Sequence, residues 1–265
     1  MTGGSPPPPA RILAVLGIGL LALPLLGLIS NVPWARLTSI LSTTEVRQAL
    51  FVSAAASAVS AVCSLMLGLP LAWLLSTSGR GRGLIRALCT LPLVLPPVVG
   101  GIALLFAFGR QSVLGSFLST TLGIEVPFTF GAVVMAQSFV AMPFLVLTVE
   151  AALRNVDHDL PEAGRTLGGT ELLVFRRVMV PSIRSALVAG VVLSWARAFG
   201  EFGATITFAG NFPGRTQTLP LAVYLSLSSD SETANVLALV MVVISLGVLF
   251  GLRRQFLGTL FRSQR

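Results

Sequence analysis

Few side chains in this sequence are arranged for chemistry, and the residue types that are missing exclude several reaction classes. The chain has a single histidine, His158, and so has no His pair for a metal ion. It contains no lysine, which excludes a Walker A phosphate loop and Schiff-base chemistry, because both depend on a Lys side chain. Cys63 and Cys89 lie in or beside apolar segments and indicate neither a disulfide framework nor a metal site. Any ATP used by this protein must therefore bind another chain, and no metal or cofactor is expected in this one.

One pair of opposite charges lies inside an apolar stretch. Arg197 and Glu201 are four residues apart and so share one side of a helix. Charges within a membrane are costly and usually mark a path or a paired site. An ion pair that fixes helix packing and a role in a gate or pathway both fit this spacing. Glu201 is a poor anion ligand by itself, and we group it with Arg197, Gly200 and Gly203 as pathway or gate candidates.

The segment 150–184 is too polar to enter lipid and too regular to be a slack linker. Asp159 is expected to cap a short helix, with Pro161 in the first turn, where its missing N–H is not needed. Glu162 would complete a capping box with Asp159. The segment therefore predicts a short helix that lies outside the membrane.

Glycines are expected to end this helix and to separate it from a second one. Gly168 and Gly169 follow the helix, and glycine readily takes the left-handed conformation of a helix C-terminus. Thr170 is then placed to cap a second helix that runs to Pro181. Two interpretations remain, a plain surface helix and a rigid knob on which a partner protein docks.

The elements that must position these residues are membrane helices. Of the 265 residues, 54% are hydrophobic and only 11% are charged, against about 25% charged in soluble domains. A hydrocarbon core about 30 Å thick needs roughly 20 apolar residues as a helix. Six stretches have this length: 12–30, 49–76, 88–108, 126–149, 186–208 and 234–252. The predicted fold class is an all-α polytopic membrane protein with six transmembrane helices.

The arginines, which are the only basic residues, predict the orientation. The net charge is +8, but the arginines lie between apolar runs rather than on one polar face, which excludes a nucleic-acid partner. Cytoplasmic loops carry an excess of positive residues. With both termini in the cytoplasm, four arginines lie outside and one within the fifth stretch, while thirteen lie inside. The inside set is Arg11, Arg80, Arg82, Arg86, Arg154, Arg165, Arg176, Arg177, Arg184, Arg253, Arg254, Arg262 and Arg265.

This topology divides the chain into four parts. Residues 1–11 are expected to form a disordered cytoplasmic tail, 12–30 a retained first helix, 45–252 the main transmembrane domain with the loop 150–184, and 253–265 a second tail. Prolines and glycines interrupt the third and fourth stretches, as either static kinks or path-lining features. Four serines recur on one face of the second stretch, where small hydroxyl residues favour close packing over pore lining. They are Ser53, Ser57, Ser60 and Ser64.

The loop 150–184 resembles the cytoplasmic loop of ABC importer permease subunits. That family has Glu-Ala-Ala, three residues, Gly, nine residues and then Ile-x-Leu-Pro. This chain keeps the spacing, with Gly168 six residues and Pro181 nineteen residues after Glu162. The departures are Gly164 for the second Ala, Val178 for Ile and Val180 for Leu.

The resemblance implies a type I ABC importer permease fold and a set of partners. Glu162, Ala163 and Gly168 would form the contact and turn that dock into an ATP-hydrolysing subunit, which would bind ATP and Mg²⁺. The assembly would contain two such subunits, a second permease copy to complete the path, and an extracytoplasmic binding protein, all at the cell membrane and within its lipid.

A second resemblance concerns the substrate. The run from Arg197 to Pro220 looks like that of molybdate permeases, while sulfate permeases resemble only its first half. The run Pro-Gly-Arg-Thr-Gln-Thr-Leu-Pro, residues 213–220, favours molybdate, with sulfate or tungstate as alternatives. In this outer loop Asn211, Arg215, Thr216 and Gln217 fit a solvated loop, or one that meets a docked binding protein or the released anion.

Two other classes remain as alternatives. An ATP-independent secondary transporter would need a coupling-ion site and often has inverted repeats, and neither is visible. A membrane enzyme would need a nucleophile with a base, and His158 has no companion motif.

Overall fold

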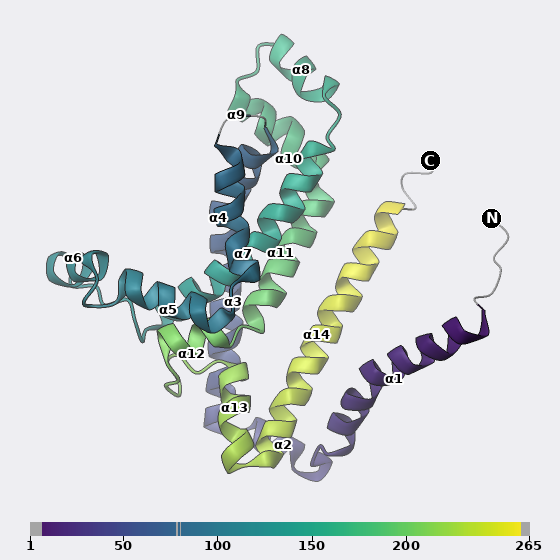
Figure 1. Ribbon diagram of the computed structural model, residues 1–265, viewed down its shortest axis with the longest axis vertical. Coiled ribbons are helices and arrows are strands. Elements are labelled where there is room, and N and C mark those ends of the chain that lie inside the picture. The colour runs from purple at the N-terminus through teal and green to yellow at the C-terminus, as the bar shows by residue number, and fades with distance from the viewer. Residues whose placement is uncertain (1–6, 78, 80, 261–265) are drawn as a thin grey trace.

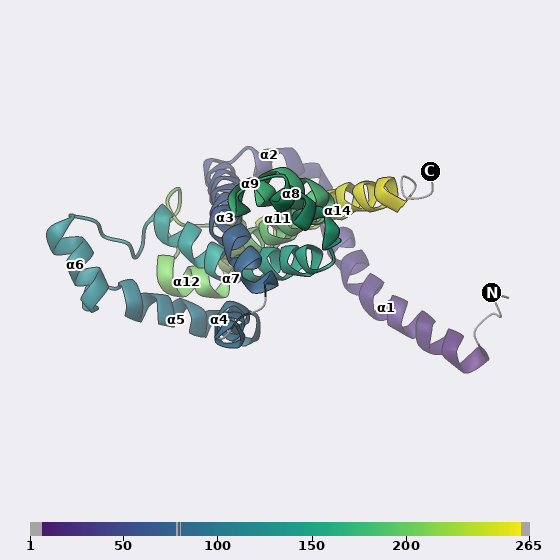
Figure 2. The ribbon, with the colours of Figure 1, turned by 90° about the horizontal axis from the view of Figure 1, so that it is seen from above.

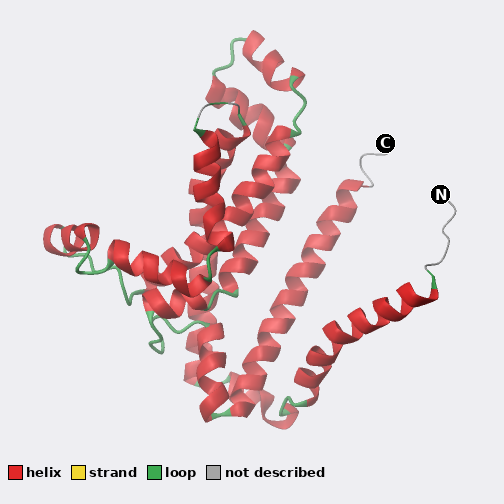
Figure 3. Ribbon diagram, viewed as in Figure 1, coloured by secondary structure: helices red, strands yellow, loops and turns green. Residues whose placement is uncertain are grey.

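The computed structural model describes residues 7–77, 79 and 81–260, and every regular element within them is helical (Figure 3). The first half contains α1 (Pro8–Ser30), η1 (Trp34–Arg36), α2 (Leu37–Leu41), α3 (Thr44–Ser76), α4 (Arg82–Val94), α5 (Pro97–Phe108), α6 (Val113–Thr121) and α7 (Phe130–Arg154). The second half contains α8 (Asp159–Thr166), α9 (Glu171–Val174), the π-helical turn η2 (Phe175–Met179), α10 (Val180–Ser182), α11 (Arg184–Phe199), α12 (Gly203–Ala209), α13 (Leu219–Ser229) and α14 (Ser231–Leu260).

The structure contains the six predicted spans if each of two bent helix pairs is counted as one span. Four helices, α1, α3, α7 and α14, are each long and apolar enough to cross a membrane. Two bent pairs complete the set: α4 with α5, at 120°, and the α9–α10 stretch with α11, at 80°. The two ends of the chain extend as helices further than expected, since α1 already begins at Pro8 and α14 continues to Leu260. The remaining parts of the predicted tails, 1–6 and 261–265, lie outside the described residues.

The third predicted span, 88–108, is divided into α4 and α5. A pair of prolines, among the residues expected to interrupt this stretch, explains the break. Leu95 precedes Pro96 and is extended, with φ −65° and ψ 135°. A residue before proline is pushed out of the α region, because the proline ring clashes with its backbone. Pro97 then occupies the first turn of α5, where its missing N–H is not needed. The bend therefore follows directly from the Pro-Pro sequence.

The fifth predicted span, 186–208, is also divided. Helix α11 ends at Phe199 and α12 begins at Gly203, so residues 200–202 carry no helix between them. At its other end α11 meets the α9–α10 stretch at Ile183, where the chain bends by 80°. Apolar composition alone could not place the break at residues 200–202, because α11 and α12 on either side of it are both largely apolar.

The core lies where α3, α7 and α11 run alongside one another (Figure 1). The four serines of α3 are fully buried there, as the packing interpretation predicted. Ser60 Oγ accepts a hydrogen bond from Ser138 Oγ of α7 at 3.1 Å, and Ser53 Oγ accepts one from the backbone N–H of Leu219 at 2.6 Å. Small residues also bring α11 close, since a Cβ on Gly190 would lie 3.5 Å from Cα of Leu145. Close backbone approach thus acts together with a buried apolar cluster that includes Leu75, Leu145 and Phe175.

Three parts of the molecule project from this bundle. Helix α8 lies at one end of the long axis (Figure 1), and the α5–α6 arm extends to one side while α1 extends to the other (Figure 2). None of the apolar window of α1 is buried, so its whole side-chain surface is available to lipid or to another subunit.

Candidate functional site

Helix α8 forms in the predicted place but starts differently. Its first helical residue is Asp159, and the preceding residue, His158, makes no side-chain capping bond. The cap comes from Asp157, whose Oδ1 accepts the N–H of Asp159 at 3.1 Å. The predicted capping box of Asp159 and Glu162 is therefore wrong, although Pro161 lies in the first turn as expected and is buried. An acidic side chain two residues earlier fulfils the same need for a hydrogen-bond acceptor.

The predicted turn after α8 is confirmed. Gly168 has φ +83°, the left-handed conformation that a side chain would disfavour. The N–H of Gly169 donates to the carbonyl of Gly164 at 3.0 Å. Thr170 caps α9, because its Oγ1 accepts the N–H of Leu173 at 3.3 Å. The chain is thereby folded back sharply between the two short helices.

Gly164, a departure from the family motif, has a structural reason. A Cβ at this position would lie 3.0 Å from Cγ2 of Val174 in α9. Glycine here lets α8 approach α9 more closely than alanine would. An exposed ion pair adds to this contact, since Arg165 Nε lies 2.7 Å from Glu171 Oε1 and Arg165 Nη2 lies 3.2 Å from Oε2. This hydrogen bonding lowers the pKa of the Glu171 carboxyl below its usual range and raises that of Arg165.

The outward surface of α8 carries the other motif residues. Glu162 and Ala163 are exposed, and so are two leucines near them, Leu160 at 48% and Leu167 at 88%. Pro181 does not join them: it lies in α10, just before the bend into α11. Because Pro181 has no N–H to bond the carbonyl of Arg177, the α-helical pattern is interrupted near it, and the π-helical turn η2 precedes it. The motif residues thus lie in two places, with Glu162 and Ala163 on the projecting helix α8 and Pro181 in α10 near the bend into α11.

A charge network at the base of this loop escaped sequence reasoning. Glu150 of α7 is 4% exposed and pairs with Arg86 of α4 and with Arg154, whose Nη2 is 3.0 Å from Glu150 Oε1. Arg154 Nη2 also donates to the carbonyl of Leu75 in α3 at 3.0 Å. The i, i+4 spacing of Glu150 and Arg154 was the available signal, but nothing in the sequence indicates the partner from α4. The carboxylate thus joins α7 to α4, and Arg154 joins α7 to α3.

Arg197 and Glu201 face the same side of the chain, as their spacing predicted. Arg197 Nη1 lies 2.5 Å from Glu201 Oε2, and Glu201 is 1% exposed. Glu201 Oε1 accepts the N–H of Ala204 at 2.9 Å. The side chain therefore neutralises Arg197 and at the same time satisfies an N–H in the first turn of α12. This double role accounts for a buried carboxylate at a helix break.

Glycines beside this pair allow α12 to cross α5 at very short range. A Cβ on Gly203 would lie 2.9 Å from Cβ of Pro97 and 3.1 Å from the backbone N of Val98. A Cβ on Gly101 would lie 2.8 Å from the carbonyl oxygen of Ala204. Gly200 ends α11 and has a free environment, with its nearest atom, Ala196 O, at 3.7 Å from such a Cβ. The break between α4 and α5 therefore lies against the break between α11 and α12.

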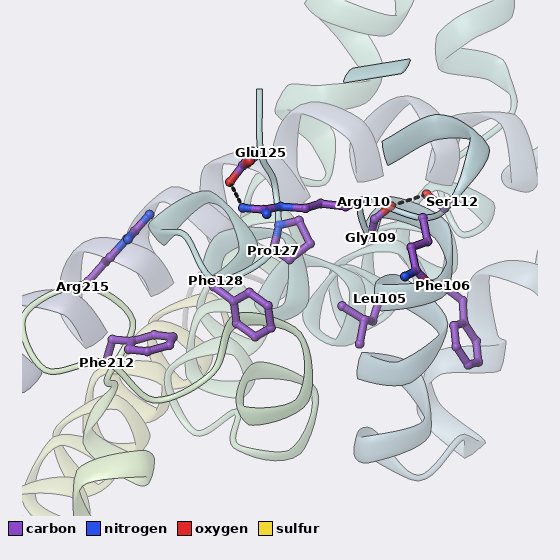
Figure 4. A pocket seen from close by; sticks show the side chains of 11 residues that line it. Leu105, Phe106, Gly109, Arg110, Ser112, Glu125, Pro127, Phe128, Phe212 and Arg215 are labelled. Atoms are coloured by element: carbon purple, nitrogen blue, oxygen red, sulfur yellow. Dashed lines mark hydrogen bonds and ion pairs between the residues drawn. The ribbon is translucent and has the colours of Figure 1, made fainter. Parts of the chain in front are cut away.

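The loop after α12 is solvated only in part, since residues 212–215 are exposed. Thr216, Gln217 and Thr218 are buried, at 0, 5 and 0% exposure. Arg215 remains exposed and lines a cavity of about 820 Å³ next to Arg110 and Glu125 (Figure 4). Among the described residues, no group of three or more His, Cys, Asp or Glu side chains is placed to hold a metal ion.

Comparison with known proteins identifies the family to which this architecture belongs. The family model described as "Binding-protein-dependent transport system inner membrane component" matches residues 64–261, a range that contains α8 and both broken spans. The chain belongs to this family. It is therefore an integral membrane protein of the permease type, as the loop motif indicated.

Individual members of the family are similar over most of their length. The molybdenum transport system permease protein ModB of Mycobacterium tuberculosis is 43% identical over 240 residues, which are 90% of each chain. The protein of the same name from Escherichia coli is 35% identical, over 82% of this chain and 95% of the relative. The sulfate transport system permease protein CysT of Salmonella typhimurium is 35% identical, over 88 and 86%.

Solved structures confirm the ABC importer permease fold. A bacterial ABC transporter involved in the import of the acidic polysaccharide alginate contains a chain with a TM-score of 0.69 at 17% identity, which covers 93% of both chains. The MetNI methionine ABC transporter in an inward-facing conformation contains one with a TM-score of 0.62 at 19% identity, which covers 80% of this chain and 94% of the other.

Proposed function

We propose that this chain is the permease subunit of an ATP-driven importer for molybdate. The observation that carries the proposal is the identity of 43% over 90% of the chain with molybdenum transport permeases. The 35% identical sulfate permease supports sulfate as the second candidate, because molybdate and sulfate share a tetrahedral dianionic form. In this proposal both termini are cytoplasmic, as the distribution of arginines favours.

ATP and Mg²⁺ bind separate ATPase subunits, two per assembly, which dock on α8. The exposed Glu162 and Ala163 supply the contact surface, and the turn at Gly168 fixes its angle. Gly164 and Pro181 act indirectly, since the first sets the distance from α8 to α9 and the second lies at the bend toward α11. A push on α8 is thereby passed to α11 and from there to the break at residues 200–202.

That break, with the crossing of α5 and α12, is the proposed gate. Arg197 and Glu201 hold α11 and α12 together across the break, and Gly200 and Gly203 permit the bend and the close crossing. A second permease copy completes the path, and an extracytoplasmic binding protein delivers the anion. The surface of α1, none of which is buried, faces lipid or the second copy.

The direct test is uptake of radiolabelled molybdate by proteoliposomes that contain the chain, its ATPase partner and the binding protein. Uptake should require ATP, and tungstate and sulfate should be compared as competitors. Glu162→Arg should abolish ATP-dependent uptake, while Glu45→Arg, an exposed residue in the first turn of α3, should not. Full uptake by Glu162→Arg would contradict the docking role, and stronger competition by sulfate than by tungstate would favour the sulfate alternative.

A further inference from the structure

The cavity beside the outer loop has the size and the charge of an anion site. Its volume of about 820 Å³ is within the range of roughly 300–1,000 Å³ that is usual for ligand pockets. Three charged side chains line it, Arg110, Glu125 and Arg215, so its formal charge is +1. In Figure 4 the guanidinium ends of both arginines lie on the side of Glu125, and phenylalanine rings form the opposite wall.

Arg215 is presented by a closed and rigid turn. The carbonyl of Phe212 accepts the N–H groups of Arg215, Thr216 and Gln217 at 3.1, 2.9 and 3.0 Å. Thr216 Oγ1 in return accepts the N–H of Phe212 at 3.0 Å. The Arg215 side chain itself has no ion pair with any other described residue. A free guanidinium on a fixed backbone is preorganised to bind an anion, because little order is lost on binding.

The aromatic wall contains backbone strain that packing maintains. Phe128 has φ +61° and is the one non-glycine residue with a positive φ in the described chain. Its ring meets that of Phe212 edge to face, with centroids 6.2 Å apart. Gly210 makes room for both rings, since a Cβ there would lie 2.8 Å from Phe212 and 3.1 Å from Phe128. Strained residues of this kind cluster at ligand sites, and the apolar rings strengthen nearby charge interactions by excluding water.

Arg110 carries a partner that can be exchanged. Its Nη2 lies 2.5 Å from Glu125 Oε2, but the two side chains are 72 and 53% exposed. Exposed ion pairs contribute little stability. A dianion that contacts two guanidinium groups therefore competes well against a single carboxylate that contacts one.

We propose that this cavity binds a tetrahedral divalent oxyanion between Arg110 and Arg215, with Glu125 as the partner of Arg110 when the site is empty. The planar guanidinium group forms paired, charge-assisted hydrogen bonds with such oxygens. The proposal rests on the proposed function for the choice of anion, and it gives the permease an acceptor site of its own. The cavity borders α5 through Leu105 and Phe106, so the anion would wait beside the crossing of α5 and α12.

The test is equilibrium binding of radiolabelled molybdate to the full chain with its ATPase partners in lipid nanodiscs, without binding protein. Arg215→Gln should weaken binding by about tenfold or more, the effect of losing a charged hydrogen bond. Glu125→Gln should strengthen it, because the competing carboxylate charge is gone. Arg36→Gln is the matched control, since Arg36 is an exposed arginine outside the cavity that pairs with Glu232. Arg215→Lys keeps the charge and should bind better than Arg215→Gln, which separates charge loss from misfolding.

Four results would overturn the site. The first is the absence of saturable molybdate binding in a complex that still imports molybdate. The second is equal weakening of molybdate binding by Arg36→Gln and Arg215→Gln, and the third is unchanged affinity in Glu125→Gln. The fourth is competition by perrhenate, a tetrahedral monoanion, that is as strong as competition by molybdate itself. Saturable molybdate binding would also be absent if a second copy or a docked protein filled the cavity, and that result too would overturn the site. Failure of the proposed function looks different, because saturable binding at this site would then persist without ATP-dependent uptake.

Discussion

Gly164 and Val174 are in such close register that a Cβ on the glycine would lie 3.0 Å from Cγ2 of the valine. Gly164→Val should therefore force α8 away from α9, at about 1–3 kcal/mol for overpacking. We expect lower ATP-dependent uptake, measured in proteoliposomes, and recovery in the double variant with Val174→Ala. Gly83→Val is the control, because a Cβ on Gly83 meets no atom within 4 Å. Equal effects of Gly83→Val and Gly164→Val would refute this explanation.

The carboxylate shared by Arg86 and Arg154 should make their substitutions non-additive. Either Arg86→Gln or Arg154→Gln leaves Glu150 with one partner, and we expect a loss of about 1.5 kcal/mol, the low end for a hydrogen bond to a charged group. The double variant leaves a buried carboxylate unpaired, for which the loss is about 3–5 kcal/mol. Thermal unfolding of the purified protein measures these changes. Arg36→Gln, from an exposed pair, should change stability by less than about 1 kcal/mol, and simple additivity in the double variant would contradict a shared carboxylate.

Gly203 is the position at which a single methyl group should affect the crossing of α5 and α12. In Gly203→Ala the new Cβ meets Pro97 and the backbone of Val98, neither of which can move as a flexible side chain does. We expect uptake to fall while ATP hydrolysis continues, so the ratio of anions imported to ATP hydrolysed should drop. Gly200→Ala has its nearest atom at 3.7 Å and should be close to wild type. If both variants behave alike, the close crossing does not control transport.

The Arg165–Glu171 pair should hold α8 against α9 over the whole physiological pH range. Arg165 lowers the pKa of Glu171 in the folded protein, relative to about 4.3 in an unfolded chain. The contribution of the pair is therefore complete above the unfolded pKa and is lost as the pH falls through the lower, folded value. Hydrogen exchange of the α8–α9 amides should be faster in Glu171→Gln than in wild type at neutral pH. The difference should disappear in strong acid, and a difference that vanished already between pH 6 and 8 would contradict the assignment.

Motif spacing predicted the short helices and turns of the loop 150–184 well because their geometry is local. The left-handed Gly168, the cap at Thr170 and the α8 helix all follow from a few neighbouring residues. The capping box failed because Asp157 offered a competing acceptor. The bend at Pro96 is local too, but its 120° angle depends on where α5 packs. The pairing of Arg86 with Glu150 and the cavity between Arg110 and Arg215 join distant parts of the chain, so spacing along the sequence carries no signal for them.

The exposed surface of α1 bears on the order in which the helices enter the membrane. Its apolar window has no buried residue, whereas more than half of that of α7 is buried inside the bundle. A helix with few contacts to the rest of the chain can enter the bilayer as soon as it is synthesised, and its polar backbone is already satisfied within the helix. Helix α7 instead carries the fully buried Gln137, whose amide has no partner among the described residues. During synthesis α1 can therefore anchor the nascent chain while α3, α7 and α11 assemble later.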